Sequence, residues 1–129
     1  MAYRAAADDQ SARCRRVMGG CSGGDIVLAQ TAQRLLHLVR SHDTAARLAG
    51  DEFVLLLRHI PPDWHGQQFL DRARRELSHP VSVDEKALPI SASLGLIVAN
   101  PRGGPDRDRD VAAVLAAADH AMYLAKAAR

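Results

Sequence analysis

The spacing of apolar residues alternates along the chain between that of a helix and that of a strand. Over residues 25–40, apolar side chains recur every three or four positions, which predicts an amphipathic helix. Asp25 stands where the N-cap or a first-turn acid of that helix would lie. Within residues 46–57, two short apolar stretches flank a glycine-containing turn, which is the pattern of a β-hairpin.

Prolines divide the rest of the chain into further elements. Pro61 and Pro62 end the second hairpin strand, because proline donates no hydrogen bond to a sheet, and Asp63 can cap the helix that follows. Pro80 ends that helix. The predicted elements are then a helix over 64–78, strands over 81–83 and 88–98 around a turn at 84–86, a loop over 101–109 and a helix over 110–128.

This order of elements predicts the fold class. Helix, two strands, helix, strands and helix are typical of an α+β domain, with an antiparallel sheet and helices packed on its faces. The 129 residues support a single domain with one core. Residues 1–23 show no comparable periodicity and predict no element with clarity.

The composition is that of an ordinary globular protein. Hydrophobic residues make up 47% of the chain and charged residues 25%, and the net charge of +2 is too small to indicate a nucleic-acid partner. No apolar run reaches membrane-spanning length, and the first residues lack the apolar core of a signal peptide. Cys14 and Cys21 have no second Cys or His pair at metal-binding spacing, so we expect reduced thiols in a cytoplasmic protein.

Two adjacent carboxylates, Asp51 and Glu52, lie at the tip of the predicted hairpin. Neighbouring carboxylates repel each other, and a bound cation removes that repulsion. Hard oxygen ligands of this kind suit Mg²⁺ (or Mn²⁺), and Mg²⁺ in proteins usually accompanies a phosphate group. The residues alone leave a second interpretation open, in which the two acids belong to a solvated Asp-Gly-type turn.

Several stretches resemble one protein family. Residues 47–53, Arg-Leu-Ala-Gly-Asp-Glu-Phe, resemble the signature of the GGDEF family, the diguanylate cyclases, with Ala49 in place of the first glycine. Residues 121–126, Ala-Met-Tyr-Leu-Ala-Lys, resemble the final helix of that family, and residues 91–96 resemble the strand before it. Residues 79–83 resemble a stretch seen often in members that are fused to an EAL phosphodiesterase domain.

The resemblance covers residues 20–128 in one register. Gly20 and Gly24-Asp25 fit the family's glycine-histidine-x-x-glycine-aspartate step, with Cys21 in place of the histidine. The segment 1–19 matches poorly. The fold that the resemblance implies is the ferredoxin-like palm of nucleotidyl cyclases, as one GGDEF domain over residues 1–129.

The activity that the resemblance implies is condensation of two GTP molecules to cyclic di-GMP and pyrophosphate by a homodimer in which each domain presents one GTP. This chemistry depends on positioning and charge neutralisation more than on covalent catalysis. The implied roles are metal binding and catalysis for Asp51 and Glu52, guanine binding for Asp25, close approach of the nucleotide at Ala49 and Gly50, and phosphate binding for Lys126. Considered without the resemblance, Asp25 fits a helix cap and Lys126 a solvated helix surface.

A second site is implied by Arg40-x-x-Asp43, which lies five residues before Ala49. This is the family's spacing for an inhibitory cyclic di-GMP site, in which an arginine fork binds phosphate or guanine and the aspartate binds a guanine edge. On its own, an Arg-x-x-Asp sequence is usually a solvated turn. A further arginine from the next helix could join the site, and the sequence leaves three candidates open, namely Arg72, Arg74 and Arg75.

The N-terminal part departs from the family pattern. Family members have a helix and then an apolar strand that ends in Asp-x-Asp-x-Phe-Lys, followed by Asn-Asp. In this register only the first aspartate is retained, as Asp8, which would be a further metal ligand. The other family positions are occupied by Gln10, Ala12, Arg13, Arg16 and Val17. We therefore expect the first strand and the helix before it to be missing or degenerate.

Two hypotheses of different class follow from this partial match. In the first, the chain is a diguanylate cyclase domain whose N-terminal part is degenerate or truncated. In the second, it is an inactive GGDEF module. Such a module would bind cyclic di-GMP or GTP and regulate a partner, such as an EAL or sensory domain of a parent protein. A shifted reading frame or a wrong start of the gene is a third explanation for the unusual N-terminus.

Overall fold

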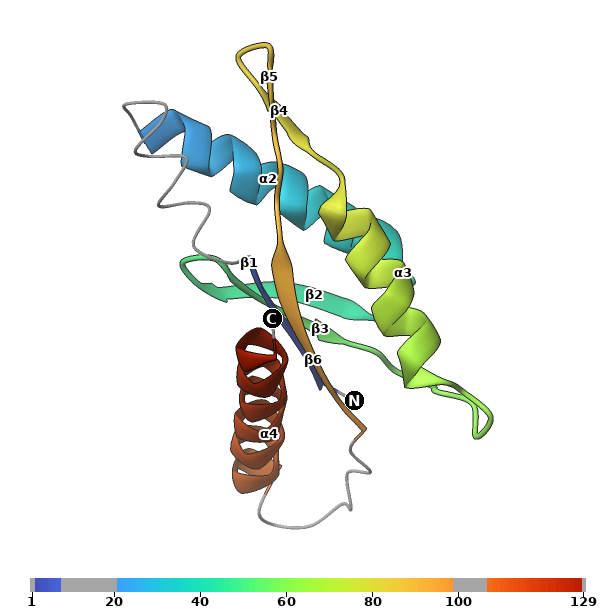
Figure 1. Ribbon diagram of the computed structural model, residues 1–129. Helices are drawn as coiled ribbons and strands as arrows, with labels where there is room; N and C mark the ends of the chain where they lie inside the picture. Colours follow the sequence, from blue (N-terminus) through green and yellow to red (C-terminus); the bar gives the residue numbers. More distant parts are fainter. Residues whose placement is uncertain (1, 8–20, 99–106, 129) are drawn as a thin grey trace.

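The computed structural model describes residues 2–7, 21–98 and 107–128 (Figure 1). Its elements are, in chain order, β1 (Ala2–Ala7), α2 (Cys21–Leu38), β2 (Thr44–Ala49), β3 (Glu52–Leu56), α3 (Gly66–Ser78), β4 (Val81–Val83), β5 (Lys86–Leu88), β6 (Ala92–Ile97) and α4 (Arg107–Ala127). The predicted α+β class with an antiparallel sheet is confirmed.

Four strands form the main sheet in the order β2–β3–β1–β6, and each neighbouring pair is antiparallel. β1 lies inside the sheet, where Ala5 is opposite Phe53 of β3 and Leu94 of β6. Helices α2 and α3 cover one face of the sheet, and α4 packs on the other (Figure 1). The β2–β3 hairpin therefore forms one side of the sheet, with its tip and its base at opposite ends.

The first strand is present, so of the two alternatives expected for it, missing or degenerate, the first is wrong. The alanine-rich segment Ala2–Ala7 forms β1, although alanine has a low preference for strands. The reason is that β1 is paired along both of its edges, with β3 and with β6. Tertiary pairing on two sides outweighs the weak local preference, so the strand position is filled by a sequence that does not resemble the family's first strand.

The main hydrophobic core lies between the sheet and helices α2 and α3. Phe53, Leu55 and Leu57 point into it, as the two-residue period of a strand requires. The helices contribute Leu35, Leu38, Phe69, Ala73 and Leu77. Leu55 and Ala73 are completely buried. The β2–β3 hairpin is thereby fixed against both helices.

Two predicted helix caps are wrong. Helix α2 begins at Cys21, so Asp25 lies within the helix on its exposed side and does not cap it. Helix α3 begins at Gly66, and its N-cap residue His65 makes no side-chain capping bond. Asp63 instead belongs to a turn that the Trp64 amide closes by donating to the Pro61 carbonyl at 3.0 Å.

The predicted strand over 88–98 is divided into two strands of different sheets. β5 pairs with β4 in a separate two-stranded sheet, whereas β6 joins the main sheet. Pro89 follows β5 directly, and it has no N–H with which to continue the pairing. Helix α4 spans Arg107–Ala127, close to the predicted 110–128. Within the described residues, no helix is long and apolar enough to span a membrane.

Strand β6 and helix α4 approach each other closely at Gly95. A Cβ atom at this position would lie 2.4 Å from the Ala118 carbonyl oxygen and 2.4 Å from the Met122 amide nitrogen. Both are main-chain atoms of α4, and the Ala118 and Met122 side chains are buried there. The packing of α4 on the sheet therefore requires a residue without a side chain at position 95.

Candidate functional site

The tip of the β2–β3 hairpin is a tight turn at Gly50 and Asp51. Gly50 has φ +49°, a left-handed conformation that favours glycine. The Arg47 Nε donates to the Gly50 carbonyl at 2.7 Å, and the pairing of β2 with β3 shifts register between Arg47 and Ala49. This arrangement holds Asp51 and Glu52 next to each other at the tip, where both are half-exposed.

These two carboxylates fit a hard divalent cation. Mg²⁺ is commonly held by one or two carboxylates, with substrate phosphates and waters completing its shell. In the described ranges 2–7, 21–98 and 107–128, no group of three or more His, Cys, Asp or Glu residues could hold a metal ion. The expected further ligand, Asp8, lies outside the described residues. A phosphate-bearing ligand would therefore have to supply the other donors that the described chain lacks.

A groove of about 400 Å³ lies between α2 and the β2–β3 hairpin. Its lining is Asp25, Leu28, Ala29, Ala32, Leu35, Leu36, Ala45, Ala46, Arg47 and Phe53. The apolar floor suits a planar ring, and the exposed Asp25 carboxylate can accept hydrogen bonds from the edge of that ring. Because Arg47 lines the groove and also bonds the Gly50 turn, the groove leads to the acidic tip. Lys126, exposed in the last turn of α4, is not among the lining residues.

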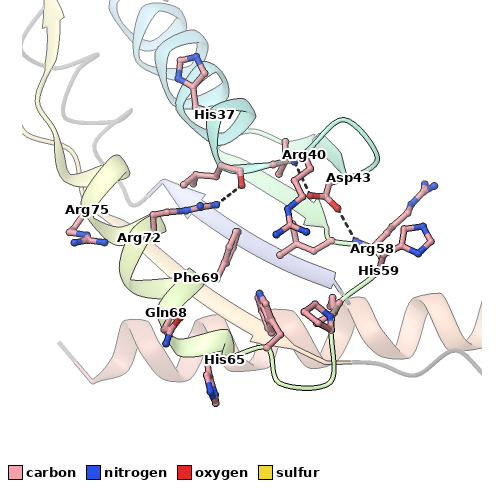
Figure 2. A pocket seen from close by; sticks show the side chains of 16 residues that line it. His37, Arg40, Asp43, Arg58, His59, His65, Gln68, Phe69, Arg72 and Arg75 are labelled. Carbon is pink, nitrogen blue, oxygen red and sulfur yellow. Dashed lines mark hydrogen bonds between the residues drawn. The ribbon is translucent and has the colours of Figure 1, made fainter.

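A second pocket, of about 480 Å³, lies at the base of the same hairpin (Figure 2). It is formed by the C-terminal end of α2, the end of β3 and the first turns of α3. The residues that line it are His37, Leu38, Val39, Arg40, Asp43, Leu57, Arg58, His59, Ile60, Pro61, Trp64, His65, Gln68, Phe69, Arg72 and Arg75. The structure thus brings Arg40 and Asp43 together with arginines of α3. Four arginines and one aspartate give this pocket an excess of positive charge, which suits an anion.

The arginines of α3 have separate roles. Arg74 is outside the pocket lining and pairs with Asp71 at 3.0 Å on the helix surface. The Arg72 guanidinium lies over the Phe69 ring at 5.6 Å and donates to the Leu38 carbonyl at 2.7 Å, so that it links α3 to the end of α2. Arg75 is exposed at the pocket, and its guanidinium has no hydrogen-bond partner within the described part of the chain.

Arg58 and Trp64 are pocket residues that the sequence analysis missed. The position of Arg58 follows from the hairpin register, because Thr44 pairs with Leu56 and the residues just outside this pair must meet at the hairpin base. Accordingly, the Arg58 amide donates to Asp43 Oδ1 at 2.8 Å. Counting outward from the Gly50 turn could have placed Arg58 beside Asp43, whereas the loop that carries Trp64 leaves no such signal in the sequence.

The pKa of Asp43 lies below its ordinary value of 3.8. Burial raises the pKa of this carboxyl, but hydrogen bonds from the Arg58 and Arg40 amides lower it, as do the charges of His42 and Arg40, and the lowering effects prevail. The His42 Nε2 lies 3.7 Å from Asp43 Oδ1. The carboxylate form of Asp43 therefore contributes to the stability of the hairpin base.

This lowered pKa predicts how stability depends on pH. A group with a lower pKa in the folded state stabilises the fold fully above its unfolded pKa, and the contribution is lost as the pH falls through the folded pKa. We expect Asp43→Asn to lower the free energy of unfolding most at about pH 5, where the carboxyl is ionised, and by progressively less below about pH 4. Urea unfolding of both proteins across this range measures the difference, and a difference that stays constant in acid would contradict the prediction.

Comparison with known proteins identifies the family. The sequence model of the family described as diguanylate cyclase, GGDEF domain, matches residues 18–129 of this chain. The chain is 37% identical over 103 residues to the bifunctional diguanylate cyclase/cyclic di-GMP phosphodiesterase MucR of Pseudomonas aeruginosa, a match that covers 80% of this chain and 14% of MucR. It is 32% identical over 108 residues to the diguanylate cyclase TpbB of the same species, covering 83% of this chain and 24% of TpbB.

Solved structures show the same similarity. The GGDEF domain of TpbB (also named YfiN) from Pseudomonas aeruginosa superimposes with a TM-score of 0.82 at 27% identity, over 99% of this chain and 76% of that one. A sensory box/GGDEF family protein from Caulobacter crescentus gives a TM-score of 0.79 at 30% identity, over 99% and 78%. The chain belongs to the GGDEF family, and it spans a seventh of MucR and a quarter of TpbB.

Proposed function

We propose that this domain binds GTP with Mg²⁺ (or Mn²⁺) at the β2–β3 hairpin and condenses two GTP molecules to cyclic di-GMP in a homodimer in the cytoplasm. The observation that carries the proposal is the continuity of the hairpin tip with the α2 groove. Arg47 belongs to both, since it lines the groove and bonds the turn that presents Asp51 and Glu52. A nucleotide with its base in the groove would have its phosphates at the two carboxylates.

In this proposal each residue has a limited and distinct role. The Asp25 carboxylate would accept from N1–H and the 2-amino group of guanine, and the left-handed turn at Gly50 would let the phosphates lie against the main chain. Asp51 and Glu52 would hold the cation, which neutralises the phosphate charge when bound. Lys126 would add a point charge at the phosphates. The 3′-hydroxyl of each GTP would then attack the α-phosphorus of the other, so that two phosphodiester bonds form and two pyrophosphates leave.

A second candidate function is binding of cyclic di-GMP without synthesis, followed by regulation of a partner domain such as an EAL or sensory domain. The observation that favours it is the cationic pocket at the hairpin base, in which four arginines accompany a single aspartate. By contrast, the sequence has Arg16 in place of the family's asparagine, and of the family's Asp-x-Asp sequence only the first aspartate is retained, as Asp8. The two candidates share the pocket and differ in whether the hairpin tip is active.

The full chain incubated with GTP and Mg²⁺ distinguishes the two candidates. Chromatographic detection of cyclic di-GMP together with a coupled assay for pyrophosphate would support synthesis. Calorimetric titration with cyclic di-GMP in the absence of GTP would measure the pocket separately. Binding without synthesis supports the regulatory function, whereas the absence of both binding and synthesis would contradict both proposals.

The cationic pocket gives a prediction of its own. Because the Arg40 guanidinium lines the pocket and donates no hydrogen bond within the described residues, it is available for a phosphate or a guanine, and we expect Arg40→Ala to weaken cyclic di-GMP binding by roughly 10- to 100-fold. The matched control is Arg74→Ala, which removes the same charge from outside the pocket lining. Calorimetry on both variants is the measurement. Equal affinities for the two would show that the ligand binds elsewhere.

A further inference from the structure

The side chain of Arg47, in strand β2, bonds the turn at the tip of the β2–β3 hairpin. Its Nε donates to the Gly50 carbonyl at 2.7 Å. Gly50 and Asp51 form the two-residue turn between the paired residues Ala49 and Glu52, so the Gly50 carbonyl belongs to neither strand. The Arg47 side chain therefore restrains a part of the hairpin that the pairing of the strands does not hold.

The main chain beside this turn is irregular. The pairing of β2 with β3 shifts register between Arg47 and Ala49, and Gly50 has φ +49°. Glycine has more conformational freedom than any other residue, so a turn that contains it next to a register shift needs a further restraint to keep one conformation. The directions of the Asp51 and Glu52 carboxylates depend on the conformation of this turn.

We propose that Arg47 is a positioning residue of the cation site at the hairpin tip. Its guanidinium holds the turn through the Gly50 carbonyl, so that Asp51 and Glu52 are already ordered when a divalent cation binds. Arg47 itself does not bind the cation. The inference rests on the function proposed for the hairpin tip, and it assigns the pre-organisation of that site to one hydrogen bond.

The sign of the effect on metal binding separates positioning from simple electrostatics. Arg47 carries a positive charge, and it bonds the turn that presents the two carboxylates to a cation. Coulomb repulsion alone predicts that removal of this charge strengthens metal binding. Loss of the bond to Gly50 has the opposite effect, because the cation must then order the two carboxylates at the moment of binding.

Two substitutions at position 47 separate the hydrogen bond from the charge. The amide nitrogen of glutamine is as many bonds from Cα as the Nε of arginine, so Arg47→Gln retains a donor for the Gly50 carbonyl and loses the charge. Methionine has a methyl group at the same place along its side chain, so Arg47→Met loses the donor and the charge together. Both variants are uncharged, and they differ in the hydrogen bond.

The experiment is titration of the full chain with Mn²⁺ alone, followed by electron paramagnetic resonance. We expect Arg47→Met to weaken Mn²⁺ binding by roughly 3- to 10-fold and Arg47→Gln to bind Mn²⁺ at least as tightly as the wild type. Nuclear magnetic resonance relaxation of the metal-free proteins is the second measurement. The order parameters of the Gly50, Asp51 and Glu52 amides should fall in Arg47→Met and be retained in Arg47→Gln. The matched control is Arg74→Met, since Arg74 pairs with Asp71 on α3.

Each other outcome overturns the positioning role in a recognisable way. Tighter Mn²⁺ binding in both Arg47 variants would show that only the charge acts on the site. Equal weakening in both variants, or weakening in Arg74→Met as large as in Arg47→Met, would show that the bond to Gly50 has no part in it. Order parameters unchanged in Arg47→Met would show that the turn is held without this side chain. Failure of the proposed cation site itself is seen separately, as a wild-type Mn²⁺ affinity that Asp51→Asn does not reduce.

Discussion

Replacement of Gly95 with alanine is expected to lower the free energy of unfolding by about 3 kcal/mol or more. The added carbon would lie 2.4 Å from the carbonyl oxygen of Ala118 and 2.4 Å from the amide nitrogen of Met122, and neither main-chain atom can rotate away. Helix α4 would have to move off β6 as a whole, so that buried contacts of Ala118 and Met122 would be lost. Urea unfolding followed by circular dichroism measures the effect.

The chain offers a matched control for this substitution at Gly24. A Cβ atom at Gly24 would meet nothing within 4 Å, and Gly24 lies inside helix α2. Alanine is a better helix former than glycine by about 1 kcal/mol, so Gly24→Ala is expected to leave the unfolding midpoint unchanged or to raise it. A wild-type midpoint for Gly95→Ala would show that α4 does not pack on β6 at the observed distance.

The second large effect is expected at Asp51. If the domain synthesises cyclic di-GMP, Asp51→Asn should reduce the rate by about 10³-fold, because removal of one of two carboxylates weakens the hold on the cation that neutralises the phosphates. Product formation from GTP and Mg²⁺ is the measurement. Binding of cyclic di-GMP should be unchanged, since Asp51 lies at the tip of the hairpin and the cationic pocket lies at its base.

The control for Asp51→Asn is Asp63→Asn. Asp63 is an exposed acid in the turn before α3 and lines neither the groove nor the pocket, so its replacement should leave the rate within about twofold of the wild type. Retention of full activity by Asp51→Asn would contradict the metal-binding role of this residue. Loss of both synthesis and cyclic di-GMP binding would point to misfolding instead.

Much of the fold could be predicted because its elements have a local signal. The hairpin was recognisable from two apolar stretches around Gly50, and the structure places Phe53 and Leu55 in the core with the period of a strand. Helix α3 was recognisable from Phe69, Ala73 and Leu77, which the structure buries. The amphipathic pattern of an element indicates which of its faces is buried. The predicted face and the observed face are therefore the same wherever an element has a single buried face.

The rest of the fold depends on contacts between distant segments. β1 has no recognisable pattern, and it becomes a strand because β3 and β6 offer pairing on both sides. Helix α2 also begins four residues before the predicted start at residue 25. Residues 21–24 form its first turn, although two of them are glycines with a low helix preference. Both errors concern segments in which tertiary structure outweighs local preference.

The candidate sites show the same division. Asp51 and Glu52 could be singled out as adjacent carboxylates at a predicted turn, and Arg40 and Asp43 could be singled out from the spacing that the family resemblance implies. Among the arginines of α3, however, the choice depends on how the helix is rotated about its axis. Arg72 and Arg75, three residues apart, share the side that faces the pocket, and Arg74 lies on the other side of the buried stripe. The hydrogen bond that Asp43 accepts from the Arg58 amide likewise depends on the pairing of two separate segments.

The position of Trp64 has a practical consequence for the study of this protein. It is the single tryptophan of the chain, it is half-buried in the lining of the cationic pocket, and its ring centroid lies 6.1 Å from that of Phe69. Intrinsic fluorescence excited at the indole band therefore reports on one end of the β2–β3 hairpin and not on the acidic tip. A native optical reporter at the pocket allows its occupancy to be followed in real time during GTP turnover, without a label.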